Sequence, residues 1–466
     1  MTLREAIEKI KSKEISGEEL TREYLKRAHE LNPKLNAYLN IFENAPGGLP
    51  CAIKDIIMVK GEKCTAGSKI LENYVASYDA TAIKKLRARG VSILGKTNMD
   101  DSAMGTTGEY SAYGPTLNPL DPTRVAGGSS SGTASAVAGG MAMFGYGSET
   151  GGSIRVPAAW CGLVGVKPSY GRVSRHGLIP MASSLDQIAP IANTVEDAAI
   201  ALQMVAGHDA LDSTSSDFPV PDYLKALTGD IKGLRVGVPK QFFNENLDKR
   251  IADSIWKAIG DLEKLGAIVD EVSLPMTDYA LATYYVIVPA EVSANLARLD
   301  GIRYGYSVTS DEARVSSEEK KKLSLLDVYL QSRSEGFGKE VQRRIMIGTF
   351  TLSAGYYDAY YKKAQQVRTL IRRDMDIVFE DHDVIVGPTA PCMAPKLGEF
   401  KNPLDFYLAD VYAVQVNLAG IPAISVPCDR GIIDGIEMPI GFQIIGKRFA
   451  EDTILRVAHA YEQSRK

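Results

Sequence analysis

Cysteine and histidine are scarce in this chain of 466 residues, and long apolar runs are missing. The five cysteines stand apart without any C-x-x-C spacing, which argues against a disulfide framework or a cysteine-based metal site and is typical of reduced thiols in the cytoplasm. No uninterrupted apolar stretch is long enough to cross a bilayer. The N-terminus is a charged amphipathic segment without the apolar core of a signal peptide. We therefore predict a soluble cytoplasmic protein that binds no metal and contacts no membrane.

Charge of one sign is not in excess either. The chain carries 53 lysines and arginines against 57 aspartates and glutamates, a formal net charge of −4. This balance gives no general attraction for nucleic acids or anionic membranes, so any contact with RNA would be local or made by a partner. With 45% hydrophobic residues, the chain has the composition of a globular protein that buries a large core.

Strand and helix patterns alternate along most of the chain. A capping box at Ser16–Glu19 predicts a helix through Leu31, and the apolar run Pro50–Val59 predicts a strand. Late strands are expected at 383–389 and 438–445. The alternation predicts an α/β fold in which one central sheet is covered by helices on both faces.

We predict one domain with four consecutive parts. These are N-terminal helices at 1–45, a core at 46–206, a surface linker at 207–233 and a C-terminal half at 234–466. Residues 209–222 are rich in Ser, Asp and Pro, which indicates a surface segment. The C-terminal half is expected to be mainly helical between 275 and 375, with a charged loop near 307–322.

Two glycine–serine segments stand out, Ala126–Thr133 and Gly151–Arg155. Ser129 and Ser153 each follow a Gly-Gly pair, which lets the backbone turn tightly and approach a substrate closely. Glycines also leave backbone N–H groups uncovered, as a hole that stabilises an anion requires. A flexible linker is the alternative interpretation, although apolar residues follow both segments.

The segment Gly90–Thr97 matches the phosphate-loop pattern G-x-x-x-x-G-K-T letter for letter. A phosphate loop must be a glycine-rich turn between a strand and a helix. Here a helix is expected before it, at 81–89, and the inner residues Val91–Leu94 are mostly apolar. We therefore interpret the segment as a strand and not as a nucleotide site.

The segment Gly128–Gly132 fits the nucleophile elbow G-x-S-x-G, with Ser130 at its centre. An elbow follows a strand, whereas residues 118–124 are interrupted by prolines, and its triad requires a histidine. None of the five histidines has glycine-rich or otherwise catalytic surroundings. We therefore do not expect Ser130 to be a nucleophile.

A serine nucleophile without a histidine needs another base, and lysine is the remaining choice. Lysine accepts a proton near neutral pH only where burial lowers its pKa. Lys54 suits this role because apolar residues flank it in the predicted strand and because its neighbour Asp55 would lie on the other strand face. A surface lysine at the end of the strand is the alternative.

Three segments, taken together, carry a resemblance to a known family. Ala52-Ile-Lys-Asp55, Gly127-Gly-Ser-Ser130 and Gly151-Gly-Ser-Ile-Arg155 resemble, in order and spacing, the amidase signature family. The resemblance covers nearly the whole chain. It implies a single large amidase-signature domain with a central mixed sheet.

The resemblance also implies a Ser–Ser–Lys triad that works through an acyl-enzyme. Ser153 would be the nucleophile, Lys54 the base, and Ser129, which follows a cis peptide bond in the family, the bridge between them. An oxyanion hole would be formed by backbone N–H groups, those of Thr150, Gly151, Gly152 and Ser153. Asp186 and Arg155 are expected to brace the site.

Further segments narrow the resemblance within the family. Gly95–Asp100, Lys167–Arg175 and Ser183–Gln187 are similar to the glutamine-hydrolysing A subunits of tRNA-dependent amidotransferases. This similarity implies hydrolysis of glutamine to supply ammonia, which a B subunit uses to convert misacylated Glu-tRNA(Gln) to Gln-tRNA(Gln). It leaves open whether Asp-tRNA(Asn) is converted to Asn-tRNA(Asn) as well.

The same similarity implies a set of partners and a substrate pocket. B and C subunits would complete a heterotrimer, with tRNA bound mainly by B; ATP and Mg²⁺ would be used by B, and this chain would need no cofactor. Arg344 matches the family position that binds the glutamine carboxylate, Asp410 the one that binds its ammonium, and Tyr284 a further substrate contact. Arginine suits a carboxylate because its fork is bidentate. Without the resemblance, surface ion pairs or helix-face residues would be the better interpretation of these three.

Two other functions remain open. One is a free-standing amidase of the same family that hydrolyses other small amides, and the other is a non-catalytic scaffold that kept the fold. Three positions, Ala126, Ser131 and Glu149, depart from the family pattern, but none removes a member of the triad.

Overall fold

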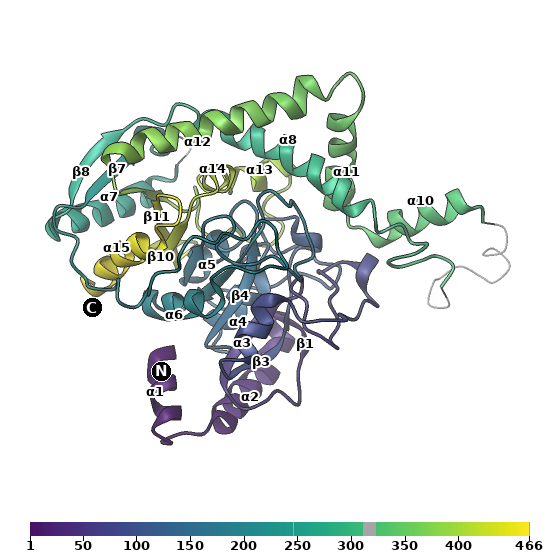
Figure 1. Cartoon of the computed structure of the whole chain (residues 1–466), viewed down its shortest axis with the longest axis horizontal. Coiled ribbons are helices and arrows are strands. Elements are labelled where there is room, and N and C mark those ends of the chain that lie inside the picture. The colour runs from purple at the N-terminus through teal and green to yellow at the C-terminus, as the bar shows by residue number, and fades with distance from the viewer. Residues whose placement is uncertain (246, 311–322, 466) are drawn as a thin grey trace.

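A mixed sheet of 11 strands runs through the computed structural model, which describes residues 1–245, 247–310 and 323–465 (Figure 1). The strand order is β1-β3-β2-β4-β6-β5-β10-β11-β9-β7-β8. Strand β2 pairs in parallel with β3 and β4, and β7 pairs in parallel with β8 and β9, whereas the other pairs are antiparallel. The strands are β1 (Tyr38–Ile41), β2 (Leu49–Lys54), β3 (Val91–Thr97), β4 (Phe144–Glu149), β5 (Val164–Lys167), β6 (Gln187–Ala192), β7 (Arg235–Pro239), β8 (Ile268–Val272), β9 (Val384–Pro388), β10 (Ala423–Ile433) and β11 (Ile436–Gly446).

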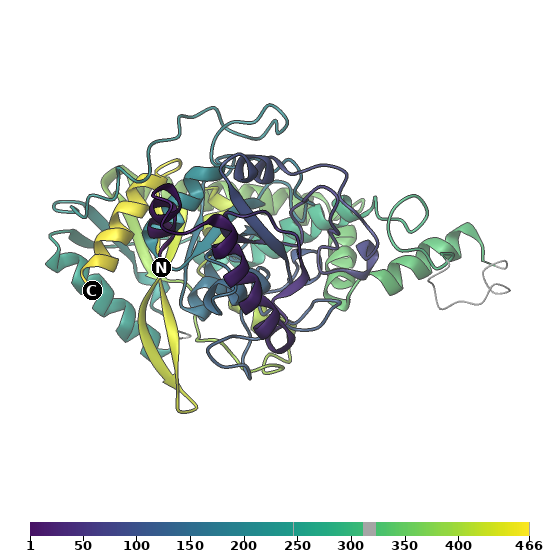
Figure 2. The same cartoon turned by 90° about the horizontal axis from the view of Figure 1, so that it is seen from below.

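Helices cover both faces of this sheet (Figures 1 and 2). Helices α4 and α5 contact each other and the middle strands, while α6, α15 and α7 contact one another in series along the sheet. Strands β2 to β6 are buried along their whole length, as strands with two covered faces must be. The predicted α/β fold with a covered mixed sheet is confirmed. The α-helices are α1 (Leu3–Lys11), α2 (Gly17–Leu35), α3 (Thr81–Arg87), α4 (Ser131–Ala138), α5 (Arg155–Cys161), α6 (Val195–Val205), α7 (Lys249–Lys264), α8 (Thr277–Leu296), α10 (Leu325–Gly336), α11 (Lys339–Leu352), α12 (Lys363–Asp381), α13 (Pro403–Leu408), α14 (Val414–Ala419) and α15 (Glu451–Gln463).

Two predicted boundaries shift in the structure. Helix α2 begins directly after Ser16, the N-cap of the predicted capping box. It continues past Leu31 to Leu35, where Asn36 in a left-handed conformation ends it. The strand predicted for Pro50–Val59 stops at Lys54, because the chain turns immediately afterwards. The end of β2 is thus the point where the sheet gives way to the loops that carry the candidate site.

The segments that match the phosphate-loop and nucleophile-elbow patterns have the structures that the sequence analysis predicts for them. The phosphate-loop-like segment contains β3, which follows α3 and is buried throughout. Ser130 follows no strand: it precedes α4, and its hydroxyl donates a hydrogen bond of 3.2 Å to the carbonyl of Ser148. The first segment therefore forms no phosphate loop, and the second forms no nucleophile elbow.

Strands β1, β4, β6, β8 and β10 were not predicted. Each is short, or interrupted by glycine or proline, so that no regular apolar alternation marks it. The mainly helical region at 275–375 is confirmed by α8, α10, α11 and α12. Of the charged loop predicted near 307–322, residues 311–322 lie outside the described residues.

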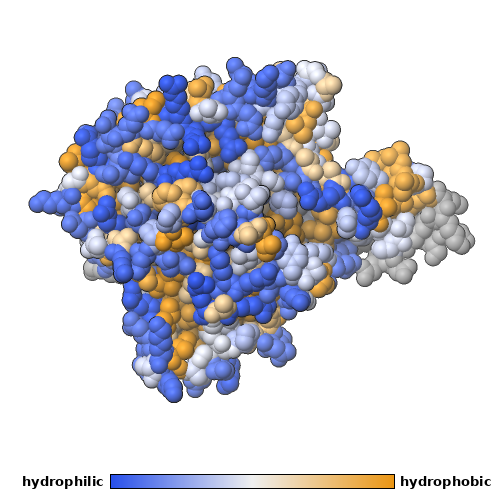
Figure 3. Space-filling model, viewed as in Figure 1, coloured by the Kyte–Doolittle hydropathy of each residue, from blue (hydrophilic) through white to orange (hydrophobic). Residues whose placement is uncertain are grey.

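Helix α10 projects from the body of the molecule (Figure 1). Figure 3 shows apolar side chains gathered on this projection, where Leu325, Leu326 and Leu330 are 70%, 64% and 54% exposed. Such a cluster on a projecting helix is typical of a contact surface. None of the helices in the described ranges combines the length and apolar character needed to cross a membrane.

Candidate active site

Lys54 is the last residue of β2, and its side chain is fully buried. Its Nζ donates hydrogen bonds to Ser129 Oγ at 2.8 Å and to the carbonyl and hydroxyl oxygens of Ser148 at 3.2 and 3.1 Å. Ser148 lies on β4, which pairs in parallel with β2, so the sheet itself brings the two residues together. Lys54 is therefore not a surface lysine at a strand end.

The environment of Lys54 favours its uncharged form. Burial lowers its pKa to about 7, although the carboxylates of Asp100, Asp186 and Glu149 oppose the shift. A large share of the amine is then free to accept a proton at neutral pH. The predicted depression of the lysine pKa is confirmed.

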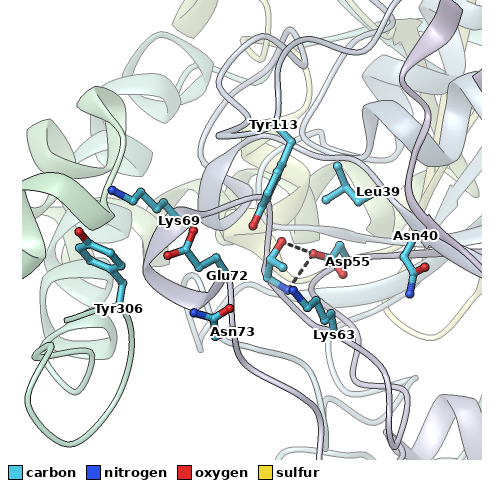
Figure 4. Close-up of a pocket in the computed structure, with 10 residues that line it drawn as sticks. Leu39, Asn40, Asp55, Lys63, Lys69, Glu72, Asn73, Tyr113 and Tyr306 are labelled. Atoms are coloured by element: carbon cyan, nitrogen blue, oxygen red, sulfur yellow. Dashed lines mark hydrogen bonds between the residues drawn. The ribbon is translucent and has the colours of Figure 1, made fainter. Parts of the chain in front are cut away.

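Asp55 directly follows β2, and its carboxylate has other partners than the amine of Lys54. Its carboxylate accepts the backbone N–H of Thr65 at 2.8 Å, and Figure 4 shows Asp55 among the residues around a pocket. Asp55 also forms a buried ion pair with Lys96 at 3.1 Å. The surrounding pocket of about 500 Å³ is lined by Asp55 but by no residue of the predicted triad. Asp55 therefore does not hold Lys54 in its charged form.

Ser129 reaches Lys54 from a packed turn. The peptide bond between Gly128 and Ser129 is cis, as the family resemblance implies. Gly127 has a φ of +83°, and a Cβ on Gly128 would lie 2.0 Å from Asp100 Oδ2. Neither position tolerates a larger residue without a backbone shift, so the Gly-Gly pair is a close-packed feature and not a flexible linker.

Ser153 lies beside this turn, just before α5. The backbone N–H of Ser130 donates to the carbonyl of Ser153 at 3.3 Å, which joins the two glycine–serine segments. Ser153 is 8% exposed, whereas Ser129 and Lys54 are 0% exposed. Of these three side chains, Ser153 is thus the one nearest to solvent and to an entering substrate.

Backbone N–H groups are available next to Ser153. Those of Gly151, Gly152 and Ser153 donate no hydrogen bond within the described part of the chain. Thr150 is fixed through its hydroxyl, which donates to Asp186 Oδ1 at 2.7 Å. Unpaired N–H groups beside a serine hydroxyl have the chemistry that an oxyanion hole requires.

A buried ion pair between Arg155 and Glu149 stabilises the turn that carries Ser153. Glu149 Oε2 accepts the backbone N–H groups of Ile154 and Arg155 at 3.0 and 3.1 Å, and Arg155 Nε donates to Glu149 Oε1 at 3.0 Å. Burial alone would raise the pKa of Glu149, but Arg155 and Lys167 together more than offset this effect and the pKa is lowered. Arg155 also donates to the carbonyl of Ala413 at 3.0 Å, which ties the turn to the C-terminal half. The bracing predicted for Arg155 is confirmed.

Asp186 braces the same turn from another side. In addition to the Thr150 hydroxyl, it accepts the backbone N–H groups of Met181 and Ala182 at 2.9 and 3.1 Å. Its predicted bracing contacts are therefore present. Burial raises its pKa to about 6, against the pull of these donors.

Two of the three predicted substrate residues lie against the glycines before Ser153. A Cβ on Gly151 would lie 2.5 Å from the hydroxyl oxygen of Tyr284, and a Cβ on Gly152 would lie 2.8 Å from Asp410 Oδ1. Burial raises the pKa of Asp410 to about 8, although Thr106 and Arg344 oppose the shift. The turn can approach these side chains so closely only because it carries no Cβ of its own.

Arg344 on α11 is held in a buried cage. Its Nε donates to Glu340 Oε1 at 2.8 Å, and the Tyr407 hydroxyl donates to the same oxygen at 2.9 Å. The rings of Tyr285 and Tyr407 have their centroids 5.2 and 5.6 Å from its guanidinium carbon, within cation–π range. Arg344 is therefore a rigid buried cation and not a surface residue.

Comparison with known proteins agrees with this geometry. The family model described as Amidase matches residues 47–455. The chain belongs to the amidase family. This amidase is 53% identical over 476 residues to the A subunit of glutamyl-tRNA(Gln) amidotransferase from Geobacillus kaustophilus, with 98% of this chain and 95% of that protein covered.

Solved structures of other amidase-family proteins have the same fold. The crystal structure of the A subunit of glutamyl-tRNA(Gln) amidotransferase from Thermotoga maritima matches with a TM-score of 0.81 and 41% identity, covering 96% of this chain and 91% of that one. The peptide amidase crystallised with the inhibitor chymostatin matches with a TM-score of 0.78 and 28% identity, covering 98% and 96%. The fold is thus shared by amidases with different substrates.

Several residues of the amidase site were not predicted from the sequence. Ser148 carries one signal, its place in the same small-residue segment as Ser153. Thr106, which contacts Asp410, and Glu340, which holds Arg344, stand in ordinary segments with no motif of their own. Such partners are set by tertiary contacts between distant parts of the chain.

Proposed function

We propose that this amidase hydrolyses glutamine as the A subunit of a tRNA-dependent amidotransferase, and that the ammonia converts Glu-tRNA(Gln) to Gln-tRNA(Gln). The observation that carries the proposal is the close approach of Asp410 to Gly152, one residue before the candidate nucleophile Ser153: a Cβ on Gly152 would lie 2.8 Å from Asp410 Oδ1. An amidase for a zwitterionic amide needs a fixed anion close to its nucleophile, whereas one for simple amides does not. The relatives named as the A subunit of glutamyl-tRNA(Gln) amidotransferase support the same activity.

The first chemical step uses all three members of the triad. Ser153 Oγ attacks the side-chain amide carbon of glutamine and passes its proton to Ser129, which passes its own to Lys54 Nζ. The three donated hydrogen bonds of Nζ belong to the ammonium form. In the neutral amine the two N–H groups can stay on Ser148, and the lone pair then faces Ser129, whose hydroxyl becomes the donor. The arrangement supports Lys54 as the final proton acceptor.

Charge develops on the amide oxygen in this step. The N–H groups of Thr150, Gly151 and Gly152 would stabilise it, and the loss of one such donor typically lowers a rate by about 10²–10³. The carbon–nitrogen bond then breaks, and the proton on Lys54 returns through Ser129 to the leaving ammonia. Water then attacks the ester on Ser153, and its proton passes through Ser129 to Lys54. The proton returns along the same path to Ser153 Oγ as the ester bond breaks and glutamate is released.

Recognition of glutamine would use opposite charges at the two ends of its backbone. Arg344 would bind the carboxylate: Glu340 occupies its Nε, and the terminal nitrogens remain for a substrate. Asp410 would bind the ammonium, and the hydroxyl of Tyr284 would contact the substrate beside Gly151. A free-standing amidase for uncharged amides would gain nothing from burying two opposite charges here.

Partners are part of the proposal. The exposed leucines of α10 support a contact surface for other subunits, and we assign the partners as a B and a C subunit in a cytoplasmic heterotrimer. B would bind most of the tRNA and use ATP and Mg²⁺, so this chain needs no cofactor for the steps above. Whether Asp-tRNA(Asn) is also a substrate depends on B.

Ser153→Ala tests the function directly. Ammonia release from glutamine should fall by about 10⁴-fold or more in the variant, because the nucleophile is gone. The assembled complex should still amidate Glu-tRNA(Gln) when free ammonia is supplied. Glutamine-dependent amidation by the variant would refute the nucleophile, and equal turnover of other small amides by the wild-type chain would favour the free-standing amidase.

A further inference from the structure

Thr106 connects two parts of the site that come from opposite halves of the chain. Its carbonyl accepts the backbone N–H of Gly128 at 2.6 Å, directly before Ser129. Its hydroxyl donates to Asp410 Oδ2 at 2.8 Å, across 304 residues of sequence. Thr106 and Asp410 are both buried, so no solvent competes for this hydrogen bond.

The loop that carries Thr106 is itself fixed. Asp100 accepts the backbone N–H groups of Gly108 and Tyr110 at 3.1 and 3.0 Å. A Cβ on Gly105 would lie 2.4 Å from the Asp100 side chain, so the loop is also packed closely against it. Thr106 therefore presents its hydroxyl from a rigid position.

The direction of the hydrogen bond determines what Asp410 can do. The hydroxyl of Thr106 donates to Oδ2, which favours the ionised carboxylate and opposes the effect of burial on its pKa. It also fixes the rotation of the carboxylate, with Oδ1 directed at Gly152. An ionised oxygen held at that point is what a substrate ammonium requires.

We propose that Thr106 is a specificity-determining positioning residue, which orients Asp410 and favours its ionised form so that the site selects amides carrying an α-ammonium group. The proposal rests on the proposed function, in which Asp410 binds the ammonium of glutamine. Thr106 does not touch the reacting atoms. It acts through Asp410, and its effect is confined to substrates that Asp410 binds.

Thr106→Val is the decisive variant, because it keeps the shape and the carbonyl bond to Gly128 and removes only the hydroxyl. The full chain is assayed alone and together with its B and C partners, and the form with the higher amidase rate is used for the comparison. The substrates are glutamine and 4-carbamoylbutanoate, which is glutamine without its amino group. The KM for glutamine should rise about tenfold, as loss of a hydrogen bond to a buried charged group predicts. The deficit in kcat/KM for glutamine should shrink as pH rises, while 4-carbamoylbutanoate shows less than a twofold change.

Controls separate this inference from the proposed function. Thr106→Ser keeps the hydroxyl and should restore the KM for glutamine. An unchanged KM in Thr106→Val, or an equal rise for both substrates, would overturn the role of Thr106. If instead Asp410→Asn leaves glutamine turnover unchanged, the ammonium site fails and the proposed function with it. Thermal unfolding of each variant checks that the loop remains folded.

Discussion

Ser148 accepts two hydrogen bonds from the Nζ of Lys54, one through its carbonyl at 3.2 Å and one through its hydroxyl at 3.1 Å. Together they fix the rotation of the amine and leave its third position facing Ser129 at 2.8 Å. One serine on β4 thereby orients the amine of Lys54, the proposed base, at the end of β2.

Ser148→Ala removes the hydroxyl contact and keeps the carbonyl. We expect kcat for glutamine to fall by roughly fivefold with little change in KM, since about 1 kcal/mol of orienting interaction is lost and the substrate contacts remain. Steady-state kinetics checks this split. A rise in KM without a fall in kcat would show that Ser148 acts on substrate binding and not on the base.

The base must be uncharged to act, which fixes the pH dependence of the reaction. Since the pKa of Lys54 lies at about 7, kcat/KM for 4-carbamoylbutanoate, which does not use Asp410, should rise about tenfold per pH unit below that value and level off above it. A profile of kcat/KM against pH between about 5.5 and 9 measures this rise. A flat profile across pH 7 would exclude Lys54 as the titrating base.

The same shift has a consequence for stability. Between about pH 7 and 10.5, the unfolded chain carries a proton on Lys54 that the folded chain has released, so the folded state gains stability as pH rises through this window. Lys54→Met has no proton to release. We expect this variant to be inactive but more stable than the wild type at pH 7, with a difference that narrows toward pH 10. Urea unfolding at several pH values measures it, and a constant difference would contradict the proton linkage.

Gly128→Ala should disrupt the turn before Ser129. The added Cβ would lie 2.0 Å from Asp100 Oδ2, and we expect a loss of about 3 kcal/mol in unfolding free energy together with loss of activity. Gly260→Ala is the matched control, because this glycine lies within α7 and a Cβ there meets no atom within 4 Å. It should gain about 0.5–1 kcal/mol through helix propensity. Equal effects at the two positions would refute the packing argument.

The buried pair of Arg155 and Glu149 should stabilise the fold far more than a surface pair. Arg155→Met leaves an uncompensated buried carboxylate and should cost about 3–5 kcal/mol. Arg235 forms a comparable ion pair with Asp270 at 2.7 Å, but at the surface, and Arg235→Met should cost at most about 1 kcal/mol. Chemical denaturation of both variants gives the comparison. Similar losses would show that burial does not control the effect.

The sequence predicted those parts of the site that lie in short contiguous motifs. Lys54, Ser129 and Ser153 each stand in a segment whose composition limits its structure, and the depressed lysine pKa follows from apolar neighbours in one strand. The pairing of β2 with β4 brings Lys54 to Ser148, whereas Ser129 reaches Lys54 at 2.8 Å from the turn before α4, a helix that contacts β2.

The remaining parts could not be predicted because they depend on contacts between distant segments. The hydrogen bond from Thr106 to Asp410 spans 304 residues, and the one from Tyr407 to Glu340 spans 67. No local pattern encodes either pair, since each residue alone is an ordinary polar side chain. Strand β10 was missed for a local reason: Pro427 interrupts its alternation, and the second part of the strand is partly exposed.

The close approach of Asp410 Oδ1 to Gly152 joins distant parts of the sequence in one place. Asp410 comes before β10 and β11, and these two strands lie between β5 and β9 in the sheet. A fragment that ends before Asp410 would therefore contain Lys54, Ser129 and Ser153 but lack both the proposed ammonium site and two inner strands of the sheet.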